Sequence, residues 1–166
     1  MEGLHSPTME NMSLQRLVYF STNALVGGDA IAANLKRILN SSIRNNVAAG
    51  ITGGLLFNRN YFVQVLEGER SGLLRIFTHI SVDPRHKDVV LVDQKPVNRR
   101  VFGAWSMGFA GRTELFDQML ARFCPSGKFD PRDMTADRLT AFTLEMVSNE
   151  SGMVSAPHDE LVKSAS

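Results

Sequence analysis

The sequence of 166 residues contains a single cysteine, Cys124, so it cannot form an internal disulfide bond. It also lacks an apolar N-terminal segment of signal-peptide length, and no run comes near the roughly 20 apolar residues that a membrane helix needs. We therefore expect a soluble protein in the reducing environment of the cytoplasm.

An excess of charge of one sign is missing as well. The 18 basic and 17 acidic residues are spread along the chain and give a formal net charge of +1. Nucleic acids and anionic membranes are bound through concentrated positive charge, and the pair Arg99-Arg100 is more typical of a solvated edge. We expect neither nucleic acid nor a membrane as a partner.

Patterns typical of enzymes are absent from the sequence. The four histidines do not have the spacing of a metal site, and there is no signature of a cysteine–histidine pair for nucleophilic catalysis. Glu67 and Glu69 flank a turn glycine without a further catalytic partner. We therefore expect that the chain is not an enzyme and binds no metal.

The sequence does contain an alternation of strand-like and helix-like segments. One helix is expected to run to about Ser42, and a second from a cap at Ser71 to a point before Pro84, because apolar residues recur there at helical spacing. Short runs of β-branched, aromatic and aliphatic residues predict five strands, over residues 17–20, 51–57, 61–66, 89–92 and 104–109.

The resulting order is βαββαββ, and right-handed crossovers favour a ferredoxin-like α+β sheet with both helices on one face. Its first and third strands should be central neighbours. Two amphipathic helices within residues 112–149 can cover the other face as a C-terminal helical cap. We expect one sheet domain over residues 14–111, flanked by a flexible segment at 1–13 and a disordered tail at 150–166.

Two polar side chains stand where strand alternation calls for apolar ones. Gln64 shares a strand face with Phe62 and Leu66, and an unpaired amide there would cost roughly 1–3 kcal/mol. Tyr19 lies on the strand expected to neighbour that of Gln64, so the two side chains could meet. Taken one at a time, each is more typical of an ordinary core hydrogen bond.

Other polar and aromatic residues are ambiguous when read singly. Asn45 and Asn46 should directly follow the first helix, where amides either end a helix or reach a ligand beside it. Alternation places Trp105, Met107 and Phe109 on one face of the last strand, which by itself indicates core packing.

Taken together, five motifs closely resemble the BLUF domain, the sensor of blue light using FAD. The resemblance covers about residues 14–110, and it is specific because the motifs occur in the family's order and spacing. The motifs are Leu17-Val18-Tyr19-Phe20-Ser21, Arg44-Asn45-Asn46 with Gly50-Ile51-Thr52-Gly53-Gly54-Leu55, Phe62-Val63-Gln64-Val65-Leu66-Glu67-Gly68, Asp83-Pro84-Arg85-His86 and Trp105-Ser106-Met107.

The resemblance implies an FAD cofactor whose ring system lies between the two predicted helices, although FMN or riboflavin remains possible. By transfer from the family's positions, Ile38 and Ile80 should contact the two faces of the ring. Asn45 and Asn46 should bind its pyrimidine edge, with Ser42 nearby.

The same transfer implies a photochemical pair. Tyr19 would give an electron and a proton to the excited flavin, and Gln64, facing the flavin's N5 and C4 carbonyl, would change its hydrogen bonds. Asp83, Arg85 and His86 would lie towards the ribityl and phosphate side.

The resemblance also implies a route for the signal, through Trp105 and Met107 to the C-terminal helices. The roughly 55 residues after the BLUF-like region are too few for a second enzymatic domain. We therefore expect a short photoreceptor that acts on an unidentified protein partner or as a homo-oligomer. The alternative is a ferredoxin-like protein-interaction module without photochemistry.

Overall fold

A five-stranded sheet forms the middle layer of the computed structural model, which describes residues 14–25, 28–111 and 114–150. The strand order is β4-β1-β3-β2-β5, with β2 and β5 parallel and the other pairs antiparallel. The strands are β1 (Leu14–Asn23), β2 (Thr52–Phe57), β3 (Tyr61–Glu69), β4 (His86–Pro96) and β5 (Gly108–Ala110).

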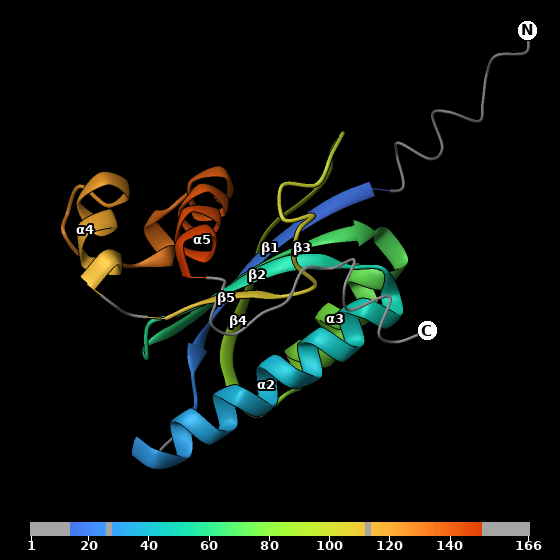
Figure 1. Cartoon of the computed structure of the whole chain (residues 1–166), viewed down its shortest axis with the longest axis horizontal. Coiled ribbons are helices and arrows are strands. Elements are labelled where there is room, and N and C mark those ends of the chain that lie inside the picture. Colours follow the sequence, from blue (N-terminus) through green and yellow to red (C-terminus); the bar gives the residue numbers. More distant parts are fainter. Residues whose placement is uncertain (1–13, 26–27, 112–113, 151–166) are drawn as a thin grey trace, which may run out of the picture.

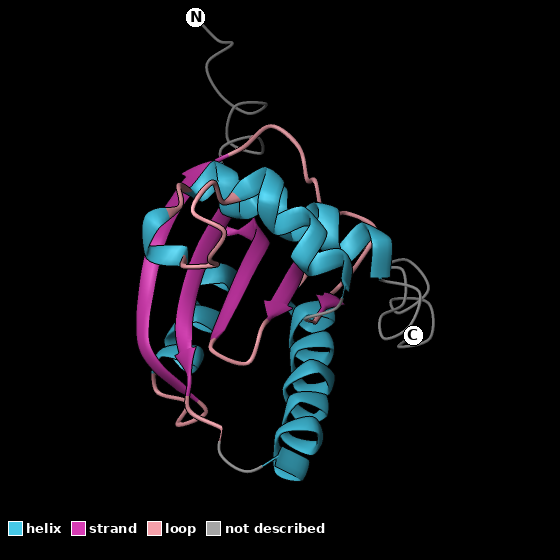
Figure 2. Ribbon diagram, turned by 90° about the vertical axis from the view of Figure 1, so that its left-hand side faces the viewer, coloured by secondary structure: helices cyan, strands magenta, loops and turns pink. Residues whose placement is uncertain are grey.

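Helices cover both faces of this sheet (Figure 1). One face carries α2 (Gly28–Ala49) and α3 (Arg70–Ser81), and the other carries α4 (Glu114–Phe123) and α5 (Ala136–Glu150). Seen from the side of α4 and α5, the helices in front lie across the strands (Figure 2). The α+β ferredoxin-like sheet with two helices on one face and a helical cap is therefore confirmed.

The middle parts of the central strands are mostly apolar because both of their faces are buried. Along β1, Leu17 and Tyr19 belong to the cluster beneath α2 and α3, whereas Val18 and Phe20 belong to the cluster beneath the cap. This alternation follows from the two-residue period of a strand. The strand order confirms the prediction that β1 and β3 are neighbours near the middle of the sheet.

The predicted end of the first helix was wrong. The helix α2 continues to Ala49, because the partly buried Ile43 extends its apolar stripe beyond Leu39. Asn45 and Asn46 therefore lie inside the last turns of α2 and do not follow it.

The predicted last strand was too long, since β5 begins only at Gly108. Before it, Trp105 forms only an isolated bridge to the sheet and Met107 lies in a bend, so strand alternation does not apply to them. Trp105 packs into the cluster beneath the cap, and Met107 is buried in the cluster beneath α2 and α3. The expectation that both share one face was therefore wrong.

Some predictions concern residues near the two ends of the chain, which the structure does not describe. The expected flexible segment at 1–13 and residues 151–166 of the expected tail lie outside the described residues. Two cap helices are present as predicted, with Thr135 Oγ1 accepting a hydrogen bond from the backbone N–H of Arg138 at 3.1 Å at the start of α5. The helix α5 extends to Glu150, one residue beyond the predicted boundary of the cap.

A glycine allows α5 to approach the sheet closely. A Cβ added to Gly108 would lie 2.2 Å from Cγ1 of Val147, a buried residue of α5. No real side chain tolerates that distance, so the packing of the cap on β5 depends on the missing methyl group.

We predict that Gly108→Ala lowers the free energy of unfolding by about 1–3 kcal/mol, because the added methyl group overpacks this contact. Urea denaturation measures the loss. Adding Val147→Ala should make the double variant less destabilised than the sum of the two single variants. Gly103→Ala is the control, since its Cβ would meet only Arg100 Cβ at 3.6 Å; equal losses at both glycines would contradict the prediction.

Candidate functional site

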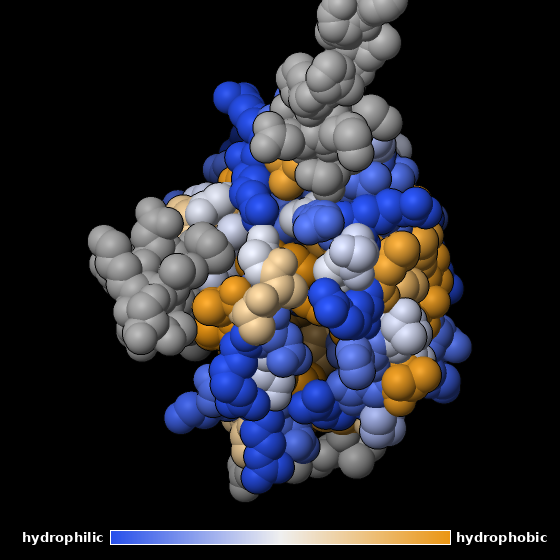
Figure 3. Space-filling model, turned by 90° about the vertical axis from the view of Figure 1, so that its right-hand side faces the viewer, coloured by the Kyte–Doolittle hydropathy of each residue, from blue (hydrophilic) through white to orange (hydrophobic). Residues whose placement is uncertain are grey.

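A cavity of about 620 Å³ opens on the face of the molecule that carries α2 and α3. Figure 3 shows hydrophobic side chains within this hollow and hydrophilic ones around it. Its volume is within the range of about 300–1,000 Å³ found for sites that bind cofactors and other small molecules. The lining comes from β1, β2, β3, both helices and the segment that leads into β4.

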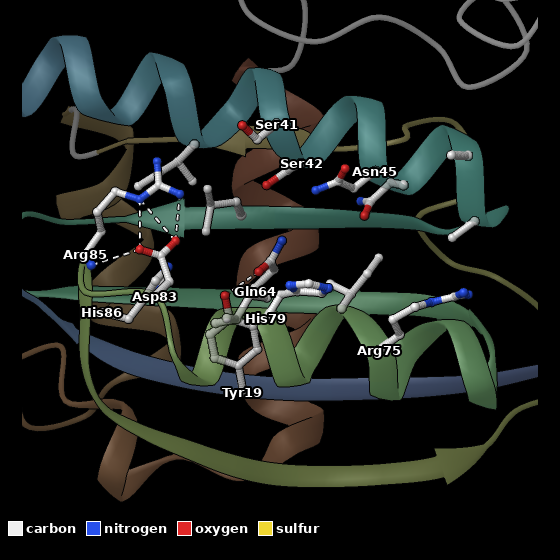
Figure 4. A pocket seen from close by; sticks show the side chains of 17 residues that line it. Tyr19, Ser41, Ser42, Asn45, Gln64, Arg75, His79, Asp83, Arg85 and His86 are labelled. Carbon is white, nitrogen blue, oxygen red and sulfur yellow. Dashed lines mark hydrogen bonds and ion pairs between the residues drawn. The ribbon is translucent and has the colours of Figure 1, made fainter.

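Tyr19 and Gln64 meet in the wall of this cavity (Figure 4). They are directly opposite each other in the β1–β3 ladder, and their exposed fractions are 1% and 3%. The Tyr19 hydroxyl donates a hydrogen bond to Oε1 of Gln64, and Nε2 of Gln64 donates to the sulfur of Met107 at 3.6 Å. The expectation that the two polar side chains could meet is confirmed.

Burial determines the state of the Tyr19 phenol. Desolvation raises the pKa of Tyr19 well above its usual value of 10.0, and the negative charge of Asp83 raises it further. The hydroxyl, which is protonated at neutral pH even with an ordinary pKa, thus stays protonated to higher pH as a hydrogen-bond donor to Gln64.

Asp83 and Arg85 form a salt bridge at one end of the cavity (Figure 4). Nη2 of Arg85 lies 2.6 Å from Oδ2 of Asp83, and Nε lies 3.0 Å from both carboxylate oxygens. Partial burial alone would raise the pKa of Asp83, but the hydrogen bonds and the charge of Arg85, aided by the charge of His86, outweigh it and lower this pKa. Both members of the pair are therefore charged at neutral pH.

His86 lies beside this pair and beneath Phe62. Its Nδ1 is 2.6 Å from the hydroxyl oxygen of Ser21, and its ring centroid is 4.6 Å from that of Phe62. Burial lowers the pKa of His86 from 6.5 to about 4, and this effect outweighs the opposing attraction of Asp83. The imidazole is therefore neutral at pH 7.

The helix α2 presents a row of residues to the cavity. Ile38, Ser42 and Asn45 recur at spacings of four and three, which places them on one side of a helix. Asn46 is buried, and its Nδ2 donates a hydrogen bond to the backbone oxygen of Ser106 at 2.6 Å. An apolar wall and amide groups thus occur along the same helix.

The nine residues predicted to bind the cofactor all line this one cavity, together with Tyr19. Their individual contacts with a flavin stay predictions. Of the two predicted relay residues, Met107 touches Gln64 from outside the cavity lining, and Trp105 lies in the cap cluster. The nine are Ile38, Ser42, Asn45, Asn46, Gln64, Ile80, Asp83, Arg85 and His86.

Polar residues that the sequence did not single out also line the cavity, namely Ser41, Arg75 and His79. Arg75 and His79 are four residues apart on α3, so they lie on the same side of the helix. Each directly precedes an isoleucine that lines the cavity, Ile76 or Ile80. Counting back from Ile80 by one helical turn leads to Ile76, so the helical period alone does not identify Arg75 or His79. No group of three metal-ligating side chains occurs in the part of the chain that the structure describes.

A family model described as "Sensors of blue-light using FAD", or BLUF, matches residues 14–108. The chain belongs to the BLUF family. The matched range holds the whole five-motif series and every residue that lines the cavity. Blue-light sensing with a flavin is therefore the function of this domain.

Relatives of this BLUF protein include much longer chains. The beta subunit of photoactivated adenylate cyclase from Euglena longa is 37% identical over 93 residues, which are 55% of this chain and 10% of the relative. The alpha subunit from Euglena gracilis is 36% identical over 109 residues, or 66% of this chain and 10% of the relative. The chain thus spans about a tenth of the length of these relatives.

Some similar solved structures are closer to this BLUF protein in size. BlsA in its photo-activated state has a TM-score of 0.74 and 27% identity, over 83% of this chain and 97% of that chain. BlrB, a BLUF protein in its dark state, has a TM-score of 0.66 and 29% identity, over 84% and 98%. Among the described residues, no helix of this BLUF protein is long and apolar enough to cross a membrane.

We predict that the free energy of unfolding falls as the pH is lowered from about 6.5 to about 4, by at most about 1.4 kcal/mol per pH unit. Within this range the unfolded chain binds a proton at His86 and the folded chain does not. Urea denaturation of the wild type and of His86→Gln checks the effect, which the variant should lack.

Ser21→Ala is the control for this pH experiment. It removes the hydroxyl beside His86 but keeps the burial that is the main cause of the lowered pKa. The control should therefore retain most of the pH dependence. An identical pH dependence in the wild type and in His86→Gln would show that another group is responsible.

Proposed function

We propose that this chain is a short blue-light photoreceptor in which Tyr19 and Gln64 form the photoactive switch. The hydrogen bond from the Tyr19 hydroxyl to Oε1 of Gln64, in the wall of the cavity, supports this assignment. A phenol and an amide held in contact between buried strands suit proton-coupled electron donation followed by a change of hydrogen-bond partners.

The chemistry of the cavity fits a flavin. Ile38 on α2 and Ile80 on α3 provide apolar groups on two sides, and Asn45 and Gln64 provide amides for a polar edge. At one end, the guanidinium of Arg85, which is paired with Asp83, is a charged donor of the kind that suits a phosphate-bearing side chain. We propose FAD as the flavin, with FMN or riboflavin as alternatives that share the same ring.

The protein residues have distinct tasks in this proposal. The bound flavin supplies the absorption of blue light and, when excited, the oxidising strength. Tyr19 is held protonated and pointed at Gln64, so an electron lost from its ring can be accompanied by its hydroxyl proton moving to Oε1. Gln64 can then reverse its donor and acceptor groups, because one amide carries both. The electron and the proton return to Tyr19, so the cycle ends without net oxidation or reduction.

We propose that the signal leaves the cavity through Met107. Its sulfur accepts a hydrogen bond from Nε2 of Gln64, and a turned amide no longer donates there. Trp105, two residues earlier in the chain, packs with the cap cluster that includes Val147 of α5. A displacement of this segment can therefore alter the packing of α5 and, through it, a protein partner or a second copy of the chain.

We predict that blue light causes a small, reversible red shift of the flavin absorption while the flavin stays oxidised. Tyr19→Phe removes the hydroxyl and Gln64→Leu removes the amide, so each should abolish the shift. Absorption spectra before and after illumination measure it. Permanent bleaching, or no change in the wild type, would contradict the proposal.

Tyr61→Phe is the matched control for the tyrosine, because Tyr61 is the second of the two tyrosines and lies on the cap side of the sheet. It should keep the red shift. A colourless purified protein that takes up no added flavin would favour the alternative of an interaction module instead.

We predict that Trp105→Ala keeps the red shift but abolishes light-dependent changes in hydrogen exchange within α5 (Ala136–Glu150). The indole packs in the cluster beneath the cap, where its ring centroid is 6.4 Å from that of Phe102, whereas the hydrogen bonds of Gln64 go to Tyr19 and Met107. Trp105→Phe should restore the response, since it keeps an aromatic ring in the cluster. A normal light response of α5 in Trp105→Ala would exclude this route.

A further inference from the structure

Glu67 is a fully buried acidic residue that the flavin site does not use. It lies on β3, three residues after Gln64, so its side chain is on the opposite face of the sheet. Its exposed fraction is 0%, whereas a buried carboxylate is tolerated only where several donors replace water. The hydrogen-bond partners of Glu67 therefore show which parts of the fold its carboxylate holds together.

Each carboxylate oxygen of Glu67 accepts a hydrogen bond from the backbone of the loop between β4 and β5. The N–H of Val101 donates to Oε2 at 2.8 Å, and the N–H of Phe102 donates to Oε1 at 2.7 Å. Nε of Arg16 lies 3.0 Å from Oε2, and the hydroxyl of Thr52 lies 3.4 Å from Oε1. One side chain thus joins three strands to this loop.

Arg100 belongs to the same loop and attaches it to the sheet through hydrogen bonds that its own side chain donates. Its Nη1 donates to the hydroxyl of Thr52 at 2.9 Å and to the backbone oxygen of Glu67 at 3.0 Å. Its Nη2 donates to the backbone oxygen of Gly50 at 3.0 Å. Residues 100–102 are therefore tied to the sheet by both side-chain and backbone groups.

A short hydrogen-bonded path leads from this anchor to the switch. The backbone N–H of Trp105 donates to the oxygen of Phe102 at 3.1 Å, and the oxygen of Trp105 accepts from Gly53 at 3.1 Å. Two residues later, the sulfur of Met107 accepts the hydrogen bond of Gln64. The position of Met107 therefore depends on a turn whose first residue is held by Glu67.

We propose that Glu67 is a positioning residue of the photoreceptor, which holds the loop from the far face of the sheet so that Met107 stands beside Gln64. The inference rests on the proposed switch. When Gln64 returns to its dark arrangement, its Nε2 must find the sulfur of Met107 in place. The Glu67 anchor therefore sets the rate of recovery from the light-induced state.

Glu67→Gln tests this role with little change in shape. The amide has one acceptor oxygen in place of two, so Val101 or Phe102 loses its partner. Recovery in the dark, followed as decay of the red shift in the flavin-loaded protein, should become at least about tenfold slower, the effect of one hydrogen bond to a charged group. Glu69→Gln, an exposed position on the same strand, should recover like the wild type. Unchanged or faster recovery in Glu67→Gln would overturn the proposal.

A double variant separates positioning from a general loss of stability. In a Met107→Ala background there is no sulfur to place, so adding Glu67→Gln should leave the recovery rate of Met107→Ala unchanged. The same slowing in both backgrounds would show that Glu67 does not act through Met107, and would overturn the proposal.

Arg100→Gln provides a second variant if Glu67→Gln does not fold. It removes the guanidinium bonds to Thr52, Gly50 and the Glu67 backbone at a half-buried position, and it should also slow recovery in a manner that depends on Met107. Wild-type recovery in Arg100→Gln would then overturn the proposal. A missing red shift in the wild type would instead refute the proposed switch itself, so the two failures are distinguishable.

Discussion

The antiparallel pairing of β1 with β3 sets Tyr19 directly opposite Gln64, and the remaining parts of the site depend on this register. Paired residues of antiparallel strands point to the same face, so the phenol and the amide meet without help from a loop. A shift by one residue would send one of them to the cap side. The pairing extends from Leu14↔Glu69 to Thr22↔Tyr61, which makes such a shift costly because the whole apolar pattern would move with it.

The sheet separates the cavity from the helical cap. The cavity lies beneath α2 and α3, whereas α4 and α5 pack on the opposite face. The segment before β5 spans this division at the sheet edge, since Met107 is buried on the cavity side and Trp105 on the cap side. Because β5 pairs with β2 over only three residues, this segment has few ladder bonds of its own. Side-chain contacts must therefore fix its position.

Strand alternation and helical spacing were enough to predict the sheet, both of its helical layers and the contact of Tyr19 with Gln64. The resemblance to the family supplied the cofactor residues, which the backbone pattern alone left as ordinary core and turn positions. The wrong predictions for Trp105 and Met107 concern residues outside the continuous strands, where the two-residue period of a strand does not hold. Trp105 lies in an isolated bridge and Met107 in a bend, so their opposite directions are set by bonds such as that from Gly53 to Trp105. The donors to Glu67 are backbone groups 34 and 35 residues away, and no pattern of residue types reveals them.

The buried polar groups of the protein differ in how firmly they are held, and this difference favours Gln64 as the element that changes. Glu67 and Asp83 are bound by charged or multiple donors, which are the stronger class of hydrogen bond. Gln64 is bound on one side by a neutral phenol and on the other by a thioether sulfur, which is a weak acceptor. Turning the amide therefore gives up only one weak bond and one neutral bond. The same sheet can hold its loop through Glu67 and still leave a weakly bound amide at its centre.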